Sequence, residues 1–216
     1  MLAVVTLALK GWYDHRENLA LRGRMLDDCA ALFGQAEISV GSDGFPVLTG
    51  KIGDGRLARI DLIADTLVTR RLPQLWLRLT IIDRPSRRDF SVGALARATG
   101  AEFYSIVAEM PERFATFGDL PLLVRGKRVP KRIESIATPL LINLFADARL
   151  KEAAVTPNGV RIVRQASEGD RASHILLRQV RFGDETVPNE TLRLAIENAT
   201  SLEVGLIGEN RVREMT

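Results

Sequence analysis

Two groups of basic residues are the clearest candidates for contact with an anionic partner. The larger group leads into a predicted helix and comprises Arg125, Lys127, Arg128, Lys131 and Arg132. Cations at the start of a helix oppose its dipole, so these side chains do not stabilise that helix. Anionic lipid headgroups attract such residues by about 1 kcal/mol each. The smaller group lies in a polar loop and comprises Arg84, Arg87 and Arg88.

Three interpretations of these basic groups stay open. A solvated loop is the simplest, and contact with anionic lipid is the next. Nucleic-acid binding is the least favoured, because no aromatic side chains are interleaved for base stacking. The net charge is also only +3, although the calculated pI is about 9.3.

A second kind of candidate site consists of arginines on the faces of predicted strands, namely Arg59, Arg78, Arg161 and Arg178. If several of them converge in a concave pocket, they would form an anion-binding or hydrolytic site. Asp61 and Asp65, near one strand end, are two carboxylates that could support acid–base chemistry. Solvated charges on a strand face are the commoner explanation for such a pair.

Nucleophiles and metal ligands are scarce in this chain. Cys29 is the single cysteine and falls on the apolar stripe of a predicted helix, which favours an inert core thiol. His15 and His174 are far apart in sequence, so a two-histidine metal site is not expected. The chain also lacks the glycine-rich, zinc-protease, serine-hydrolase and EF-hand motifs. The sequence therefore predicts no cofactor and favours a non-enzymatic role.

The first 13 residues resemble the end of a membrane segment. Met1–Leu9 is apolar except for one threonine, but nine helical residues rise only about 14 Å, and a bilayer core needs about 30 Å. Lys10, Trp12 and Tyr13 follow in the order typical of the cytoplasmic end of a transmembrane helix. We therefore expect a missing upstream apolar stretch and an inner-membrane location in a bacterium, with the domain on the cytoplasmic side. The alternative is a short element packed on a cytoplasmic domain.

Composition places the rest of the chain among ordinary globular domains. Of its 216 residues, 46% are hydrophobic and 26% are charged, which is sufficient for a real core. One cysteine excludes an intrachain disulfide, so no oxidising compartment is implied.

Hydrophobic periodicity predicts an α+β fold, in which antiparallel sheets are covered by helices. Apolar residues at helical spacing predict helices over 14–33, 132–148 and 189–201. Alternating patterns and tight turns predict strands over 37–40, 45–52, 56–64, 72–82, 90–98, 102–107, 152–155, 160–165 and 173–182. On the strand over 72–82, leucines at alternate positions should face the core, opposite Trp76, Arg78 and Thr80.

The two halves of the chain look alike. Residues 36–50 align without a gap with 151–165, and the preceding predicted helices keep the same phase. This pattern predicts two similar helix-plus-β-hairpin halves, over 14–109 and 132–206, joined by a connection over 110–131 and followed by a tail over 207–216. A functional site would then be expected at the seam between the halves.

Three functional hypotheses follow. The leading one is a non-enzymatic, membrane-tethered cytoplasmic module that binds another protein or assembles with itself. The alternative is an anion- or small-ligand-binding domain, possibly hydrolytic, that uses arginines on a sheet face. Nucleic-acid binding is the third and least favoured.

Overall fold

The computed structural model describes residues 2–66, 72–86, 88–116, 121–169, 182 and 186–213. Nine strands form one antiparallel sheet in the order β1-β2-β3-β4-β9-β8-β5-β7-β6. The elements are, in chain order, α1 (Leu2–Gly23), η1 (Asp28–Leu32), β1 (Gly34–Val40), β2 (Pro46–Lys51), β3 (Leu57–Asp65), β4 (Gln74–Ile82), β5 (Ser91–Ala96), β6 (Glu112–Phe114), β7 (Leu122–Lys127), α2 (Lys131–Leu144), β8 (Leu150–Thr156), β9 (Gly159–Glu168) and α4 (Asn189–Arg213). The predicted α+β class with an antiparallel sheet is confirmed.

The two faces of the sheet differ in chemistry, as the alternation along β4 predicted. Leu75, Leu77, Leu79 and Ile81 are fully buried and belong to the main core. Trp76 lies in a separate, smaller cluster on the opposite face. Burial of one such aliphatic side chain stabilises the fold by roughly 1.5–3 kcal/mol, so this face supplies much of the stability.

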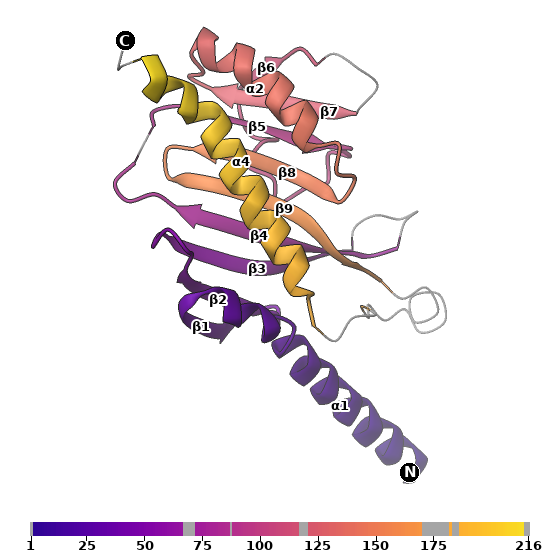
Figure 1. Ribbon diagram of the computed structural model, residues 1–216. Helices are drawn as coiled ribbons and strands as arrows, with labels where there is room; N and C mark the ends of the chain where they lie inside the picture. Colours follow the sequence, from indigo (N-terminus) through magenta and orange to yellow (C-terminus); the bar gives the residue numbers. More distant parts are fainter. Residues whose placement is uncertain are drawn as a thin grey trace.

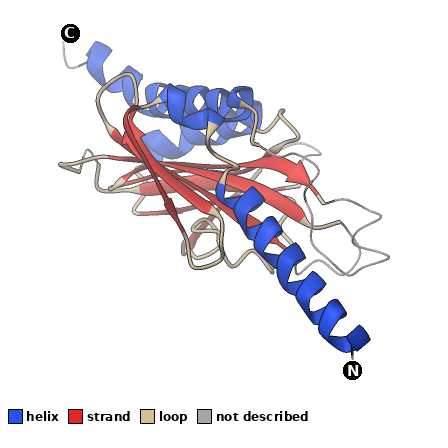
Figure 2. Cartoon of the chain, turned by 90° about the horizontal axis from the view of Figure 1, so that it is seen from below, coloured by secondary structure: helices blue, strands red, loops and turns tan. Residues whose placement is uncertain are grey.

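Helices α2 and α4 lie on the apolar face, which we call the helix face (Figures 1 and 2). Their inward residues share the core with β4, namely Ile133, Ala137 and Leu141 of α2 and Leu192, Ala195, Ala199 and Leu202 of α4. Helix α2 continues through Pro139.

The N-terminal helix was predicted with the wrong bounds. In place of one helix over 14–33, α1 ends at Gly23 and a separate 3-10 turn, η1, follows. The carboxyl end of α1 is attached to the domain through Arg22, whose guanidinium lies 5.0 Å from the ring centre of Phe45. The rest of α1 projects beyond the sheet (Figures 1 and 2).

Three further predictions need correction. The predicted strand over 102–107 is a series of turns, and the predicted connection over 110–131 contains two strands of the sheet, β6 and β7. The hairpin β8–β9 lies between β4 and β5, so the strand order does not confirm a division into two halves. The predicted tail over 207–216 begins inside α4. The predicted strand over 173–182 lies outside the described residues except for Phe182.

Candidate functional site

The sheet face opposite the helices carries a row of polar residues. Arg59 of β3 pairs in register with Thr80 of β4, which pairs with Arg161 of β9. In the next row, Arg78 donates hydrogen bonds to Asp61. Three of the four arginines predicted as a site therefore share one face of three adjacent strands. The fourth, Arg178, lies outside the described residues.

The two carboxylates considered for acid–base chemistry already have partners. Asp61 accepts hydrogen bonds from Arg78, and Asp65 accepts one from the indole of Trp76 at 3.4 Å. Both aspartates are buried, so the interpretation of them as solvated strand-face charges is wrong. Their contacts are those of structural carboxylates.

A long loop crosses this polar face, and we call it the strap (residues 97–111). It passes over the middle of the sheet, where Gly93 and Ala154 are paired. A Cβ atom at Gly93 would lie 2.8 Å from Cγ2 of Val107, so glycine is needed for the strap to lie this close. We call this side of the sheet the strap face.

Buried charges hold the strap in place. Glu152 of β8, which is fully buried, accepts hydrogen bonds from the Ser105 hydroxyl and, at 3.4 Å, from the Val107 amide. Arg161 donates to the carbonyl oxygen of Tyr104 at 2.7 Å, and its Nε lies 3.5 Å from Glu152 Oε1. Burial raises the pKa of Glu152 and lowers that of Arg161, while their mutual attraction acts against both shifts.

A second ion pair anchors the start of the strap. The Lys151 ammonium donates to Glu102 Oε1 at 2.8 Å, and both side chains are almost completely buried. Burial alone would raise the pKa of Glu102, but hydrogen bonds from Lys151 and Thr99 outweigh it and lower the pKa to about 2. The charged form of Glu102 is therefore favoured by folding.

This ion pair predicts a specific pH dependence. The ordinary pKa of Glu102 is 4.5 and its folded value is about 2, so its contribution is complete above pH 4.5. It is then lost by up to about 1.4 kcal/mol per pH unit as the pH falls towards 2. The stability difference between the wild type and Glu102→Gln should therefore be largest at neutral pH and shrink below pH 4.5. Urea unfolding at a series of pH values measures it.

The matched control is Glu109→Gln, which removes an exposed carboxylate from the same strap. Its effect on the free energy of unfolding should be small at every pH. A Glu102→Gln effect that stays constant from neutral to acidic pH would contradict the assignment.

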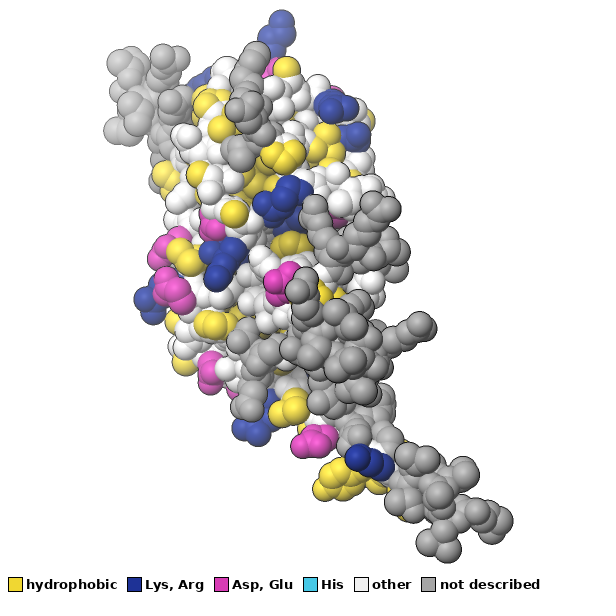
Figure 3. Space-filling model, turned by 90° about the vertical axis from the view of Figure 1, so that its right-hand side faces the viewer, with side chains coloured by type: hydrophobic (Ala, Val, Ile, Leu, Met, Phe, Trp, Pro, Cys, Tyr) yellow, Lys and Arg dark blue, Asp and Glu magenta, His cyan; other side chains and the backbone are white. Residues whose placement is uncertain are grey.

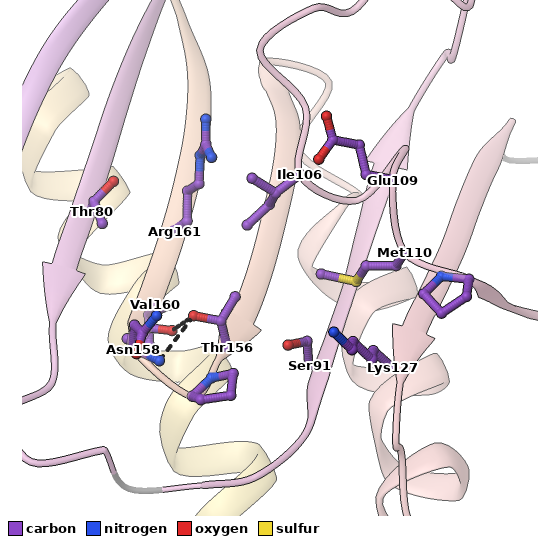
Figure 4. A pocket seen from close by; sticks show the side chains of 13 residues that line it. Thr80, Ser91, Ile106, Glu109, Met110, Lys127, Thr156, Asn158, Val160 and Arg161 are labelled. Atoms are coloured by element: carbon purple, nitrogen blue, oxygen red, sulfur yellow. Dashed lines mark hydrogen bonds between the residues drawn. The ribbon is translucent and has the colours of Figure 1, made fainter.

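Beside the strap, the sheet floor and the strap enclose a groove of about 670 Å³. It is lined by Thr80, Ser91, Ile106, Glu109, Met110, Pro111, Lys127, Thr156, Pro157, Asn158, Gly159, Val160 and Arg161 (Figure 4). The volume lies within the range of small-molecule sites. Of the predicted arginines, only Arg161 reaches the groove, so the predicted convergence of several arginines is not seen among the described residues.

No family model, curated protein or solved structure matched this chain in three comparisons. Within the described residues, no three His, Cys, Asp or Glu side chains are placed to hold a metal ion together. No helix of the described part of the chain combines the length and the apolarity needed to cross a bilayer.

The structure divides the larger basic group between two surfaces. Arg125 and Lys127 lie on β7, where Arg125 donates to the carbonyl oxygens of Ala108 and Met110 in the strap. Lys131 and Arg132 are exposed at the start of α2, and Arg128 is exposed in the turn between β7 and α2. Within this group, Lys127 alone lines the groove.

Arg88, from the smaller basic group, belongs to a buried ion network rather than to a solvated loop. We call the four residues Arg56, Asp83, Arg88 and Glu203 the Arg88 network. Arg88 lies 3.0 Å from Asp83 and 2.8 Å from Glu203, and Arg56 contacts the same two carboxylates. The network joins α4 to the end of the sheet. Arg84 is exposed, and Arg87 lies outside the described residues.

The single cysteine is a core residue, as predicted. Cys29 is fully buried, and its thiol donates a hydrogen bond to the carbonyl oxygen of Val187 at 3.5 Å. Burial, aided by the nearby charge of Asp28, raises the thiol pKa to about 12. The thiolate is therefore negligible at neutral pH. Of the histidines, His174 lies outside the described residues, and the side chain of His15 is not described.

Sequence reasoning missed Glu152, the Lys151–Glu102 pair and the partners of Arg88. One signal was present, because Lys151 and Glu152 are adjacent charges inside an otherwise apolar strand pattern. Charged residues in such a position need buried partners. Asp83 is five residues from Arg88, but Glu102 is 49 residues from Lys151, Ser105 is 47 from Glu152 and Glu203 is 115 from Arg88. No local pattern gives a clue to these distant partners.

Proposed function

We propose that this protein is a non-enzymatic module that attaches to a membrane surface through α1 and holds the sheet domain at the cytoplasmic side of a bacterial inner membrane. The supporting observation is the exposure of α1. Each side chain that is described between Leu9 and Leu21 is exposed. Isolated helices are marginally stable in water, so a helix whose described side chains from Leu9 to Leu21 are exposed is well suited to contact a bilayer.

The residue types on α1 fit the interface of a bilayer. Trp12 is 56% exposed and Tyr13 is 69% exposed, and both rings favour the headgroup layer. Lys10 and Arg16 add positive charge, and the Arg16 guanidinium lies over the Trp12 ring at 4.9 Å. On the projecting helix, hydrophobic side chains lie beside a basic one (Figure 3).

The helix and the larger basic group lie at opposite ends of the sheet. Helix α1 contacts the domain beside β2, whereas α2, which begins at Lys131, follows β7 near the other edge (Figure 1). Because α1 projects away from the sheet, we assign the lipid contact to Lys10, Trp12 and Tyr13. Lipid contact by residues 125–132 stays a prediction, which the control below tests.

Co-sedimentation with vesicles tests the proposal. The wild type should pellet with phosphatidylcholine vesicles that contain phosphatidylglycerol. The double variant Trp12→Ala/Tyr13→Ala should bind about ten-fold more weakly, because it loses both interfacial rings. Lys10→Gln should weaken binding about five-fold, and only on anionic vesicles. Trp12 emission should shift to the blue on binding, while Trp76 is already buried and provides a constant background.

The matched control is Lys131→Gln/Arg132→Gln, which removes two exposed cations at the other end of the sheet and should leave binding unchanged. A loss of binding in this variant would move the lipid contact to the larger basic group. Failure of the wild type to bind anionic vesicles, with no shift of Trp12 emission, would end the proposal.

Contact with a protein partner or a second copy also stays a prediction. The outer edge of the sheet is the place to expect it, because all seven residues of β1 are exposed, including Ile38 and Val40. Unpaired strand edges favour pairing with another strand. A single monomeric species in sedimentation velocity would argue against self-pairing.

A further inference from the structure

The groove beside the strap combines an apolar wall with a cation, Lys127, that has no ion-pair partner in the described part of the chain. Ile106, Met110 and Pro111 of the strap form the wall on one side, and Pro157 faces them from the β8–β9 turn. Lys127 and Ser91 are paired in register at the floor, and they lie side by side in Figure 4. The groove therefore offers both an apolar surface and a polar end to one ligand.

The two cationic side chains that line the groove, Arg161 and Lys127, differ in the partners that they already have. The Arg161 guanidinium already donates to Tyr104 and lies beside Glu152. For the Lys127 ammonium and the Ser91 hydroxyl, the described part of the chain offers no hydrogen bond or ion pair. Lys127 is thus the lining cation available to an anion, and Ser91 is the hydroxyl paired beside it.

The groove wall is held before any ligand binds. Arg125 donates hydrogen bonds to the carbonyl oxygens of Ala108 and Met110 at 2.9 and 3.0 Å. These two residues flank Glu109, so the strap is fixed on both sides of it. Met110 is itself buried, so its side chain is a fixed part of the wall. A preformed wall lowers the entropic cost of binding.

The charged side chains in the groove lining determine which anions the groove can bind. Lys127 supplies one positive charge at the floor, while Glu109, also in the lining, is negative and acts on Arg161 from nearby. A phosphate dianion would need two unengaged cations or a set of backbone amides. A single ammonium beside a hydroxyl suits one carboxylate or sulfonate.

We infer that this groove binds a small amphipathic monoanion, of the carboxylate class, with its charged group at Lys127 and Ser91 and its apolar body against Met110, Ile106 and the two prolines. The site is independent of α1. It therefore goes beyond the proposed membrane attachment and can fail without affecting it.

Fluorescence titration with 8-anilinonaphthalene-1-sulfonate, a monoanion with an aromatic body, tests this inference on the full chain. Lys127→Gln should weaken its binding about ten-fold, because a hydrogen bond to a charged group is lost. The neutral probe N-phenyl-1-naphthylamine should bind the wild type and Lys127→Gln equally. Thr80→Trp, which places a large ring in the groove floor, should weaken both probes. Decanoate should displace the anionic probe, whereas acetate and inorganic phosphate should not.

The matched control is Lys131→Gln, an exposed lysine outside the groove lining, which should bind both probes like the wild type. Exposed apolar residues on α1 can also bind such dyes, so the readout is the difference between variants, with near-ultraviolet circular dichroism confirming that each is folded. Equal affinity of the wild type and Lys127→Gln for the anionic probe would overturn the inference. Displacement by phosphate as effectively as by decanoate would overturn the assigned ligand class.

Discussion

Replacement of Arg88 by methionine is expected to lower the free energy of unfolding by about 3–5 kcal/mol. The Arg88 side chain is 3% exposed, and its partners Asp83 and Glu203 are 0% and 9% exposed. Removal of one member of a buried ion network leaves its partners charged and incompletely compensated. Arg88 also donates to the carbonyl oxygen of Thr156 at 3.1 Å, and the variant loses this hydrogen bond as well. Urea unfolding followed by circular dichroism measures the loss.

The same loop provides the control, because Arg84 is exposed. Arg84→Met should change the free energy of unfolding by less than about 0.5 kcal/mol. If the two variants differ by less than about 1 kcal/mol, the Arg88 network does not stabilise the fold as we argue. A double-mutant cycle with Glu203→Gln would then separate the contribution of α4 from that of the loop.

Replacement of Glu152 by leucine should lower the free energy of unfolding by a comparable amount, about 3–5 kcal/mol. Glu152 joins β9 to the strap, because it lies beside Arg161 and accepts hydrogen bonds from Ser105 and Val107. Its removal leaves Arg161 buried without its carboxylate and frees the middle of the strap. Urea unfolding gives the energy, and hydrogen exchange of the Val107 amide should accelerate in the folded variant.

A second substitution makes this prediction sharper. Substitution of both partners by apolar residues of similar size is often close to neutral, since no uncompensated charge remains. Glu152→Leu/Arg161→Met should therefore recover part of the stability lost in Glu152→Leu. A double variant as unstable as the sum of the single variants would show that the ion pair is not the source of the effect.

Elements with strong local patterns were predictable from sequence. The alternation along β3 and β4 placed each strand within two residues and assigned the correct face to Leu75 and Trp76. The Pro157-Asn158-Gly159 sequence placed the β8–β9 hairpin, in which Pro157 and Asn158 form the turn and Gly159, with a φ of 142°, pairs with Thr156. These features depend on neighbours in the chain and therefore appear in the sequence.

Elements that depend on distant partners were not predictable. The predicted connection over 110–131 contains Pro121 and Pro130, yet Pro121 immediately precedes β7 and Pro130 immediately precedes α2, positions in which the missing amide costs little. Residues 102–107 of the strap were predicted as a strand, but the shape of the strap is set by Glu152 and Lys151 on another strand. The groove exists only because the strap crosses the sheet there, so its lining could not be predicted either.

The position of the β8–β9 hairpin has a consequence for biosynthesis. Strands β4 and β5 are neighbours along the chain, but each obtains its inner partner only when this later hairpin is inserted between them. Until then, a nascent chain carries two incomplete sheets with bare edges, which are prone to pair with other chains. Translation from Ala96 to Glu168 takes roughly 4–15 s at about 5–20 residues per second. The interval ends when the hairpin forms, which takes microseconds. Until then, the nascent chain on the ribosome is most prone to misassembly.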